Sequence, residues 1–284
     1  MCAVLSAFGG PAAARIPVFI GADAPLCSKS TSAAEWHGAD GLGGTGLGAA
    51  APRGAVVPGE HAACALLRRA REAPLSVLCL GPTTNLALAL RLSGGAGEGE
   101  GPQLRHLLRR LVVMGGAYQA HGNVSPGAEF NVLEDPEAAS AVCATRWGCG
   151  LDLVTWEATR AHGIMPPCLA RWLRAGASRR GDFLSAVSAH LVAASVGFSP
   201  AMYKELGFFI PDPLAAAVAA APGIVLESVT RGVLVETAGR WGRGMTVVDW
   251  GGQYALTEAP PVVRIIQRVD QARLEALLEG SVEG

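Results

Sequence analysis

The chain has 284 residues, 50% of them hydrophobic, and a formal net charge of −1. This length is sufficient to bury one large core and is compatible with one domain or two. The near-neutral charge and the lack of a long Lys/Arg run argue against a nucleic-acid partner, and no apolar run is expected to be long enough to cross a bilayer.

The cysteines argue for a reducing compartment and against a zinc site. Zinc sites are commonly built from closely spaced Cys pairs, and no Cys-x-x-Cys pair occurs here. The seven cysteines are irregularly spaced: Cys2, Cys27, Cys64, Cys79, Cys143, Cys149 and Cys168. Because the first residues also lack a basic segment followed by a long apolar run, no signal peptide is predicted, and a cytoplasmic location is expected.

The first third of the chain alternates between short apolar runs and helical patterns. The continuous run Leu75–Leu80, closed by Gly81-Pro82, predicts a strand buried on both faces. The other predicted elements are a strand at Ile16–Gly21, a helix at Gly59–Ala73, a helix at Asn85–Leu92 opened by Thr84, and a surface loop in the Gly-rich segment Gly94–Gly101.

The same alternation continues to the end of the chain. Predicted strands are Leu111–Met114, Leu151–Trp156, Arg231–Glu236, Gly244–Asp249 and Val262–Ile266, with Asp135-Pro136 starting one helix, helices prevailing after Asp182, and a closing helix at Gln271–Leu278. Strand–helix alternation is typical of a parallel sheet with right-handed crossovers. We therefore predict an α/β fold, a mostly parallel open sheet flanked by helices, in one domain over residues 1–284.

A polar stretch, His121–Pro136, directly follows the predicted buried strand Leu111–Met114. It places Asn123, Glu129 and Asn131 close to the end of that strand. Open α/β sheets bind ligands beyond the carboxyl ends of their strands, where amides and a carboxylate suit the hydroxyls of a small polar ligand. The alternative is an ordinary polar loop.

Three further motifs each have a plain structural interpretation. Taken alone, Trp36–Gly44 favours a Gly-rich turn with an incidental histidine. Gly81–Ala87 is a strand-to-helix turn in which Thr83 or Thr84 caps the helix, and in Pro211–Ala215 the carboxylate Asp212 could simply cap the next helix.

Together, in this order on an alternating scaffold, the four motifs resemble the inosine–uridine-preferring nucleoside hydrolase family. The most specific match is Met-Gly-Gly, then Gly-Asn, then Ala-Glu-Phe-Asn and Asp-Pro-Glu-Ala, between Met114 and Ala138. The resemblance runs from about Ile16 to the last helix. It implies a Rossmann-like core and hydrolysis of the N-glycosidic bond of ribonucleosides, with a calcium ion that binds the ribose hydroxyls and the attacking water.

The resemblance also assigns roles to residues that bind the sugar. By matching position, Asn123, Glu129 and Asn131 should contact the ribose, chiefly on its 5′-hydroxyl side. Met114 should line the sugar pocket, with Phe130 beside it. A small-molecule nucleoside is thus the expected partner, and the family's habit of forming dimers or tetramers makes a homo-oligomer possible.

Metal and base contacts follow from the same matching. The carbonyl of Thr84 and the carboxylate of Asp212 correspond to two calcium ligands, and His37 lies on the loop expected to close over the base. Trp36 is a candidate to stack on the base, although a buried structural tryptophan is an equal alternative.

The sequence departs from the family at its start. The family begins with an apolar strand ending in Asp-x-Asp-x-x-x-Asp-Asp, which supplies the catalytic base and most calcium carboxylates; here the first aspartate is Asp23, beyond the first predicted strand. We therefore expect that the family's first strand–helix–strand is missing, that the chain is amino-terminally truncated, and that calcium binds weakly or not at all. Loss of a general base typically slows catalysis by about 10²–10⁴-fold.

The second departure is Pro211, where many members have a histidine that can protonate the leaving base. A purine preference through stacking on Trp36 is one hypothesis that accommodates this change. Two functions remain open: a ribonucleoside hydrolase that is impaired in this chain, and a catalytically inactive remnant that binds a ribosyl ligand or serves as an interaction protein.

Overall fold

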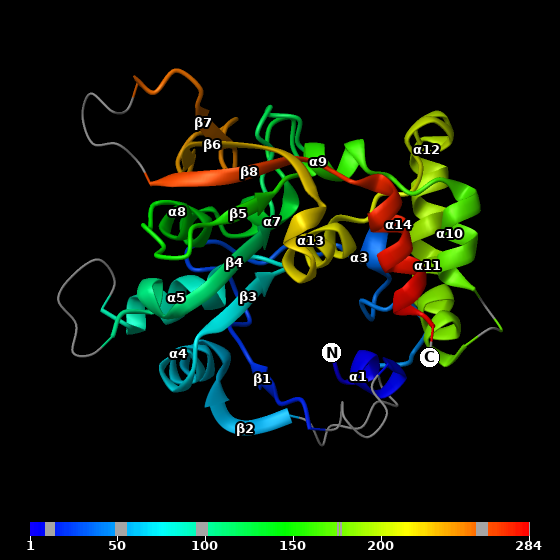
Figure 1. Cartoon of the computed structure of the whole chain (residues 1–284), viewed down its shortest axis with the longest axis horizontal. Helices are drawn as coiled ribbons and strands as arrows, with labels where there is room; N and C mark the ends of the chain where they lie inside the picture. The colour runs from blue at the N-terminus through cyan, green and yellow to red at the C-terminus, as the bar shows by residue number, and fades with distance from the viewer. Residues whose placement is uncertain are drawn as a thin grey trace.

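Six strands form the central sheet of the computed structural model, which describes residues 1–8, 15–48, 56–94, 102–174, 176, 178–253 and 261–283 (Figure 1). Their order across the sheet is β3 (Leu75–Cys79), β4 (Leu108–Met114), β5 (Asp152–Val154), β8 (Val262–Val269), β6 (Val225–Val235) and β7 (Thr246–Asp249). The pairs from β3 through β8 are parallel, whereas β6 runs antiparallel to both β8 and β7. The prediction of a mostly parallel sheet is confirmed.

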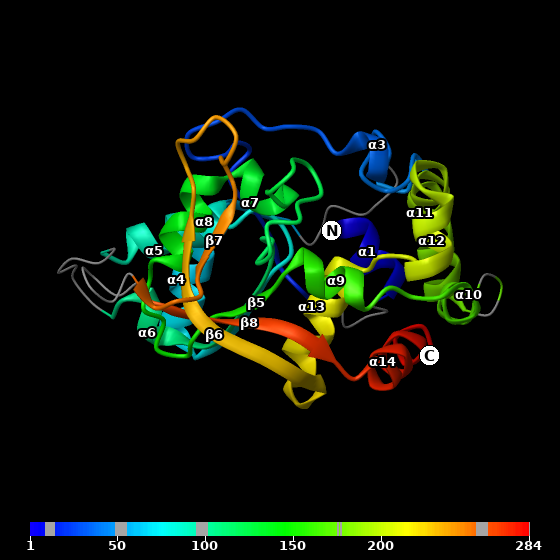
Figure 2. The ribbon, with the colours of Figure 1, turned by 90° about the horizontal axis from the view of Figure 1, so that it is seen from above.

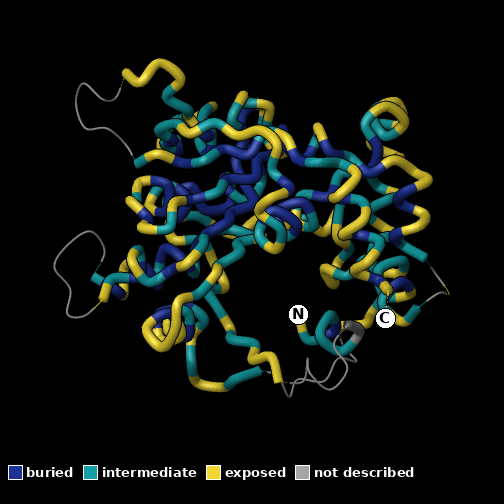
Figure 3. The backbone as a smooth tube through the Cα atoms, in the orientation of Figure 1, coloured by how far each residue is buried: buried dark blue, intermediate teal, exposed yellow. Residues whose placement is uncertain are grey.

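Strand β4 lies at the centre of the core because its side chains alternate between the two faces of the sheet. Leu111 and Val113 belong to one cluster of buried residues, and Val112 and Met114 belong to the other. In Figure 3 the buried backbone is concentrated in the middle strands of this sheet. A strand buried on both faces reads as a continuous apolar run, which is why Leu111–Met114 was recognisable.

Helices cover both faces of the sheet. One buried cluster joins the sheet to α4 (Ala62–Glu72), α5 (Thr84–Leu92) and α8 (Pro136–Cys143). The other joins it to α9 (Trp156–Ala161), α10 (Pro166–Leu173), α13 (Pro211–Ala220) and α14 (Gln271–Ser281). The shorter elements are α1 (Cys2–Phe8), α3 (Ala34–His37), α6 (Leu104–Leu107), α7 (Phe130–Glu134), α12 (Pro200–Leu206) and η1 (Pro222–Ile224).

Several boundaries differ from the predictions. The segment Val56–His61 is strand β2, paired in parallel with β1 (Val18–Ile20), so the helix predicted from Gly59 begins only at Ala62. His61 caps it by accepting a hydrogen bond from Ala63 N at 3.2 Å. The strand predicted at Leu151–Trp156 ends at Val154, and Trp156 already starts α9.

Strand β3 corrects a second expectation, that Leu75–Leu80 is buried on both faces. Ser76 is exposed, Leu80 is 39% exposed, and the rest of the run is half-buried. The reason is that β3, among the residues described, pairs with β4 alone and so forms one edge of the six-stranded sheet. An edge strand keeps one row of backbone groups and part of its side chains outside the core.

The late strands and the helix starting at Asp135-Pro136 match their predictions. Strands β6 and β7 pair in antiparallel register, with Gly232 opposite Asp249, although β6 begins earlier than expected. Asp135 caps α8 by accepting a hydrogen bond from Ala138 N at 3.0 Å. Within the predicted loop Gly94–Gly101, residues 95–101 lie outside the described part of the chain.

Helix α11 (Arg179–Phe198) overturns the expectation that no apolar run approaches the length of a membrane span. By length and composition it could cross a bilayer, and 11% of its most apolar window is buried within the protein. A single helix of this kind is weak support for a membrane location, because core helices of soluble proteins can be equally long and apolar. It packs against α1, α3, α10 and α12.

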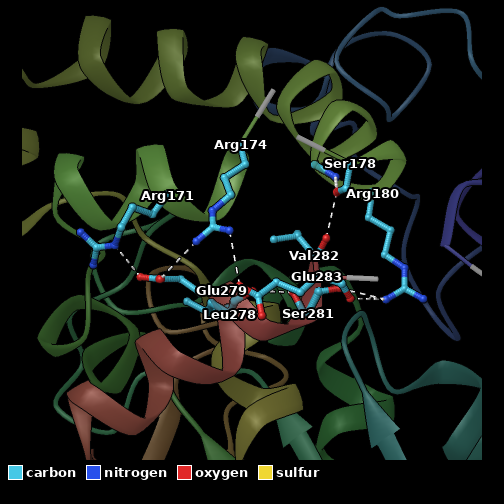
Figure 4. Close-up of polar contacts among 10 residues, drawn as sticks. Arg171, Arg174, Ser178, Arg180, Leu278, Glu279, Ser281, Val282 and Glu283 are labelled. Carbon is cyan, nitrogen blue, oxygen red and sulfur yellow. Dashed lines mark hydrogen bonds and ion pairs between the residues drawn. The ribbon is translucent and has the colours of Figure 1, made fainter. Parts of the chain in front are cut away.

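The C-terminal helix is tied to α10 and α11 by polar contacts (Figure 4). Arg171 Nε lies 2.7 Å from Glu279 Oε1, and the Ser178 hydroxyl donates to the Val282 carbonyl at 2.8 Å. Arg174 adds a longer contact of 3.4 Å to Glu283. Exposed ion pairs each stabilise a fold by at most about 1 kcal/mol, so these contacts orient α14 more than they hold it.

Candidate active site

The carboxyl ends of β3 and β4 are joined by the side chain of Asn131. Its amide nitrogen donates to the carbonyl oxygens of Leu80 at 3.3 Å and Met114 at 3.2 Å, and it also contacts Met114 Sδ at 3.2 Å. Asn131 lies in the first turn of α7, so this short helix begins where the two strands end. The predicted proximity of Asn131 and Met114 is therefore present in the structure.

Glu129 is the N-cap of α7, and its carboxylate is 98% buried with three backbone donors around it. Oε1 accepts from Asn131 N at 2.9 Å, and Oε2 accepts from Gly116 N at 2.9 Å and Val132 N at 3.2 Å. Burial, with a smaller contribution from the nearby charge of Asp212, nevertheless raises the pKa of Glu129 to about 7. This carboxylate thus organises the turn after β4, and no ligand contact is needed to satisfy its oxygens.

Asp212 is in the first turn of α13, between Pro211 and Pro213. Its side chain reaches solvent, yet enough protein surrounds it that burial raises its pKa to about 6. Its effect on the pKa of Glu129 places the two carboxyl groups in the same neighbourhood. Asp212 is therefore the solvent-exposed carboxylate of this site, whereas Glu129 is buried.

Asn123 and Phe130 complete this group, which we call the strand-end cluster: Met114, Asn123, Glu129, Phe130, Asn131 and Asp212. The Asn123 side-chain oxygen accepts from Phe130 N at 2.9 Å, which ties the loop after β4 to the start of α7. Asn123 is exposed, Phe130 is half-buried and Met114 is buried. The cluster thus presents amides and one accessible carboxylate, a combination suited to sugar hydroxyls.

Thr84 is engaged in an internal network that the sequence did not indicate. Its hydroxyl donates to Asp135 Oδ2 at 2.5 Å, and the same oxygen accepts from Leu26 N at 3.0 Å. Thr83 occupies the N-cap of α5, but its buried hydroxyl has no hydrogen-bond partner and makes no cap bond. It lines a cavity of about 20 Å³ that also touches Asn131, room for roughly one water molecule.

The described residues do not fit a calcium ion by themselves. Calcium takes about six to eight oxygen ligands. In the described part of the chain, no group of three or more His, Cys, Asp or Glu side chains converges as a metal site would require. The carboxylate of Glu129 already accepts hydrogen bonds from three backbone amides. The Asp212 carboxylate and the Thr84 carbonyl are the two groups that the sequence matches to calcium ligands.

Trp36 and His37 lie in α3, which packs against α11. Trp36 meets Phe198 edge-on with ring centroids 5.6 Å apart, and His190 Nε2 lies 3.0 Å from the Glu35 carbonyl. Partial desolvation by the surrounding protein, and then the neighbouring His190, lower the pKa of His37, although the residue is exposed. Among the described residues, no hydrogen bond or ring contact joins either residue to the strand-end cluster, and their contact with a base stays a prediction.

A long segment carries α3 from the strand-end side of the sheet to α11 (Figure 2). Its start is attached to the end of α7: the Thr31 amide donates to Glu134 Oε1 at 2.8 Å, and the Ser28 hydroxyl donates to the Glu134 carbonyl at 3.2 Å. The Thr31 hydroxyl also donates to Glu134 Oε2. These partners are more than 100 residues apart in sequence, and no local pattern could have shown them.

Gly116 shapes the turn between β4 and the cluster, and replacing it should be costly. Its φ is +76°, and a Cβ built there would lie 2.6 Å from Thr246 Oγ1. We expect Gly116→Ala to lower the free energy of unfolding by about 2 kcal/mol, because a left-handed backbone alone costs about 1–2 kcal/mol for an L-residue. Urea unfolding measures this loss.

Gly150 provides the matched control for this change. Its φ is also +76°, but a Cβ there would meet nothing within 4 Å. Gly150→Ala should therefore show the backbone cost without the clash. Equal losses in the two variants would mean that the contact with Thr246 does not constrain the turn.

A larger hollow of about 480 Å³ lies elsewhere, between α4 and α5, and is lined by Cys64, Leu67, Arg68, Arg71, Glu72 and Leu92. Arg68 is already paired with Glu60 and Glu72 at 2.8 Å each. The lining is mostly apolar, and the charges of Arg68 and Glu72 are already paired. Few polar groups remain to orient a ligand. The strand-end cluster is the better candidate site despite its smaller cavity.

Comparison with known proteins finds similar chains over most of the sequence. A family model described as inosine-uridine preferring nucleoside hydrolase matches residues 1–276. The pyrimidine-specific ribonucleoside hydrolase RihA of Klebsiella pneumoniae (strain 342) is 32% identical over 271 residues, 93% of this chain and 78% of the relative. The non-specific ribonucleoside hydrolase RihC of Shigella boydii serotype 18 is 32% identical over 239 residues, 84% of this chain and 71% of the relative.

A solved structure has the same fold. An inosine-guanosine nucleoside hydrolase superposes with a TM-score of 0.79 at 29% identity, covering 94% of this chain and 81% of that protein. The family model and the relatives both extend over most of the sequence. The chain belongs to the inosine–uridine preferring nucleoside hydrolase family.

Proposed function

We propose that this protein binds the ribose of a ribonucleoside at the strand-end cluster, and that the chain alone hydrolyses the N-glycosidic bond slowly. The observation that carries the proposal is the bridge by Asn131 between the ends of β3 and β4, next to Glu129 and Asp212. RihA is a pyrimidine-specific ribonucleoside hydrolase and RihC a non-specific one. The substrate class that the two relatives share is therefore the ribonucleoside.

The accessible groups of the cluster suit a ribose. Asp212 is an acceptor for hydroxyl groups and, with a pKa of about 6, is mostly ionised at pH 7. Asn123 is exposed and its amide nitrogen remains available as a donor while its oxygen holds Phe130 N. Hydroxyls bound by both an anion and an amide are fixed in orientation, which is what positioning a glycosidic bond requires.

Slow hydrolysis follows from the groups that this chain provides for proton transfer. A calcium ion, where bound, would supply a water of lowered pKa, and the matched positions here are Thr84 and Asp212. The carboxylate of Glu129 is held by three backbone donors. The motif Asp-x-Asp-x-x-x-Asp-Asp, which supplies the catalytic base in the family, does not occur in the sequence. Pro211, before Asp212, cannot protonate the leaving base.

A second function is favoured by one observation, that the described acidic side chains do not converge on a point. In that case the protein is a ribosyl-ligand-binding or interaction protein without turnover. The hydrolase and the ribosyl-ligand-binding protein both require the ligand to bind at the strand-end cluster, whereas an interaction protein does not. The first two differ in whether free base is released.

Base release from inosine and uridine, with and without calcium, separates these functions. We expect measurable nucleoside binding and base release about 100-fold or more slower than by a relative such as RihA assayed alongside. A rate similar to that of the relative would overturn slow hydrolysis, whereas binding with no release would support the second function. Comparable turnover of uridine and inosine would count against the purine preference expected from Pro211 and Trp36.

A further inference from the structure

The start of α9 lies against the loop that follows β4. Gly115 N donates to the Val154 carbonyl at 3.0 Å, and Trp156 N donates to the Gly116 carbonyl at 2.9 Å. These two bonds continue the parallel pairing of β4 with β5 beyond the ends of both strands. The first turn of α9 is thereby placed directly beside residues 117–121.

Glu157, in that first turn, accepts hydrogen bonds from successive backbone amides of the loop. Tyr118 N donates to Oε2 at 3.0 Å and Gln119 N donates to Oε1 at 2.8 Å, with His121 N at a longer 3.5 Å. The side chain is buried, at 8% exposure. Hydrogen bonds to a buried carboxylate are shorter and stronger than those between neutral groups, so this contact fixes the loop firmly.

The other end of the loop is fixed by Asn123. Asn123 N donates to the Ala128 carbonyl at 3.1 Å, while its side chain holds Phe130 N at 2.9 Å. Between the two anchors, Ala120 adopts a φ of 59°, the one left-handed non-glycine residue in the described chain. Such a conformation persists only where its surroundings enforce it, and here the enforcing group at the first anchor is Glu157.

We propose that Glu157 is a positioning residue of the nucleoside site: its carboxylate holds residues 117–121 in the conformation that brings Asn123 to the start of α7. This inference rests on the proposed function for its effect on ligand binding. The anchoring itself depends only on the contacts described above. Neither Glu157 nor the loop start it holds was singled out by any sequence motif.

Glu157→Gln is the informative substitution, because it keeps the shape of the side chain but replaces one acceptor oxygen with an amide donor. One of the two amides, Tyr118 or Gln119, then faces a donor and loses its partner. We expect hydrogen exchange at these two amides to quicken about 10-fold or more. The dissociation constant for inosine should rise about 5- to 20-fold in the folded protein, measured at low temperature.

Asp270→Ala is the control, because Asp270 caps α14 by accepting from Arg273 N at 3.1 Å, away from this loop. It should leave both readouts unchanged, and Glu157→Asp, which retains both acceptor oxygens, should restore part of the binding. Unchanged exchange at Tyr118 and Gln119 in Glu157→Gln would overturn the proposal, as would unchanged inosine binding where the wild type binds. If the wild type binds no inosine, the proposed function fails, and the exchange rates still decide whether Glu157 anchors the loop.

Discussion

Replacing Glu129 with glutamine should remove the larger part of a fall in folding stability that the wild-type protein shows between about pH 4.5 and pH 7. A smaller fall, up to about pH 6, should remain from the raised pKa of Asp212. Burial raises the pKa of Glu129 from 4.5 to about 7. Between these values the unfolded chain has released its proton while the native protein retains it, so rising pH favours unfolding. The loss across this window is on the order of 3 kcal/mol, since each pKa unit corresponds to about 1.4 kcal/mol.

Urea unfolding of the wild type and Glu129→Gln, at intervals from pH 4.5 to pH 8, measures this difference. The substitution will also weaken the cap of α7, because glutamine has one acceptor oxygen for the three backbone donors. The weaker cap lowers the free energy of unfolding at every pH. The titration of Glu129 instead changes how steeply that free energy falls with rising pH. Glu205→Gln, at an exposed glutamate, should keep the wild-type slope. Parallel curves for the wild type and Glu129→Gln would show that Glu129 is ionised throughout.

Asp135→Ala should be the most destabilising single substitution near the site, at about 3–5 kcal/mol. The side chain is 0% exposed and accepts hydrogen bonds from three separate segments: Leu26 N, the Thr84 hydroxyl and Ala138 N. Removing it leaves three donors without this partner, two of them, the Thr84 hydroxyl and Ala138 N, in buried hydrogen bonds. Each such loss costs about 1–3 kcal/mol, and the cap of α8 is lost as well.

Asp135→Asn distinguishes lost hydrogen bonding from lost volume. Asparagine keeps one acceptor oxygen and nearly the same size, so it should lose roughly half as much stability as alanine. Hydrogen exchange at the Leu26 amide provides a local readout, and it should quicken in both variants. A loss below about 1 kcal/mol for Asp135→Ala would mean that α5, α8 and the segment at Leu26 are held together by other contacts.

Much of the fold could be predicted because its signals are local. The run Leu111–Met114 is apolar at every position, as a strand buried on both faces must be. Asp135-Pro136 combines a side-chain acceptor with a proline at the first helical position, and both act within four residues. The strand-end cluster followed from the same logic, since Asn131 lies just after a recognisable strand.

What could not be predicted depends on partners distant in sequence. Whether Leu75–Leu80 is central or at an edge depends on which strands pair with it, and the run itself is equally apolar in both cases. Glu157 is unremarkable in sequence, because its role arises from amides nearly 40 residues earlier. The predicted contact of Glu129 with the ribose stays a prediction, whereas the three backbone amides that hold its carboxylate were not predicted, because only the folded turn brings them to it.

Binding of inosine followed by amide chemical shifts tests the central claim, ribose recognition at the strand-end cluster, most directly. We predict perturbations at Gly116, Asn131 and Asp212, also with ribose alone, and their loss in Asn131→Ala. Perturbations confined to the hollow between α4 and α5, or inosine binding unaffected by Asn131→Ala, would contradict the account.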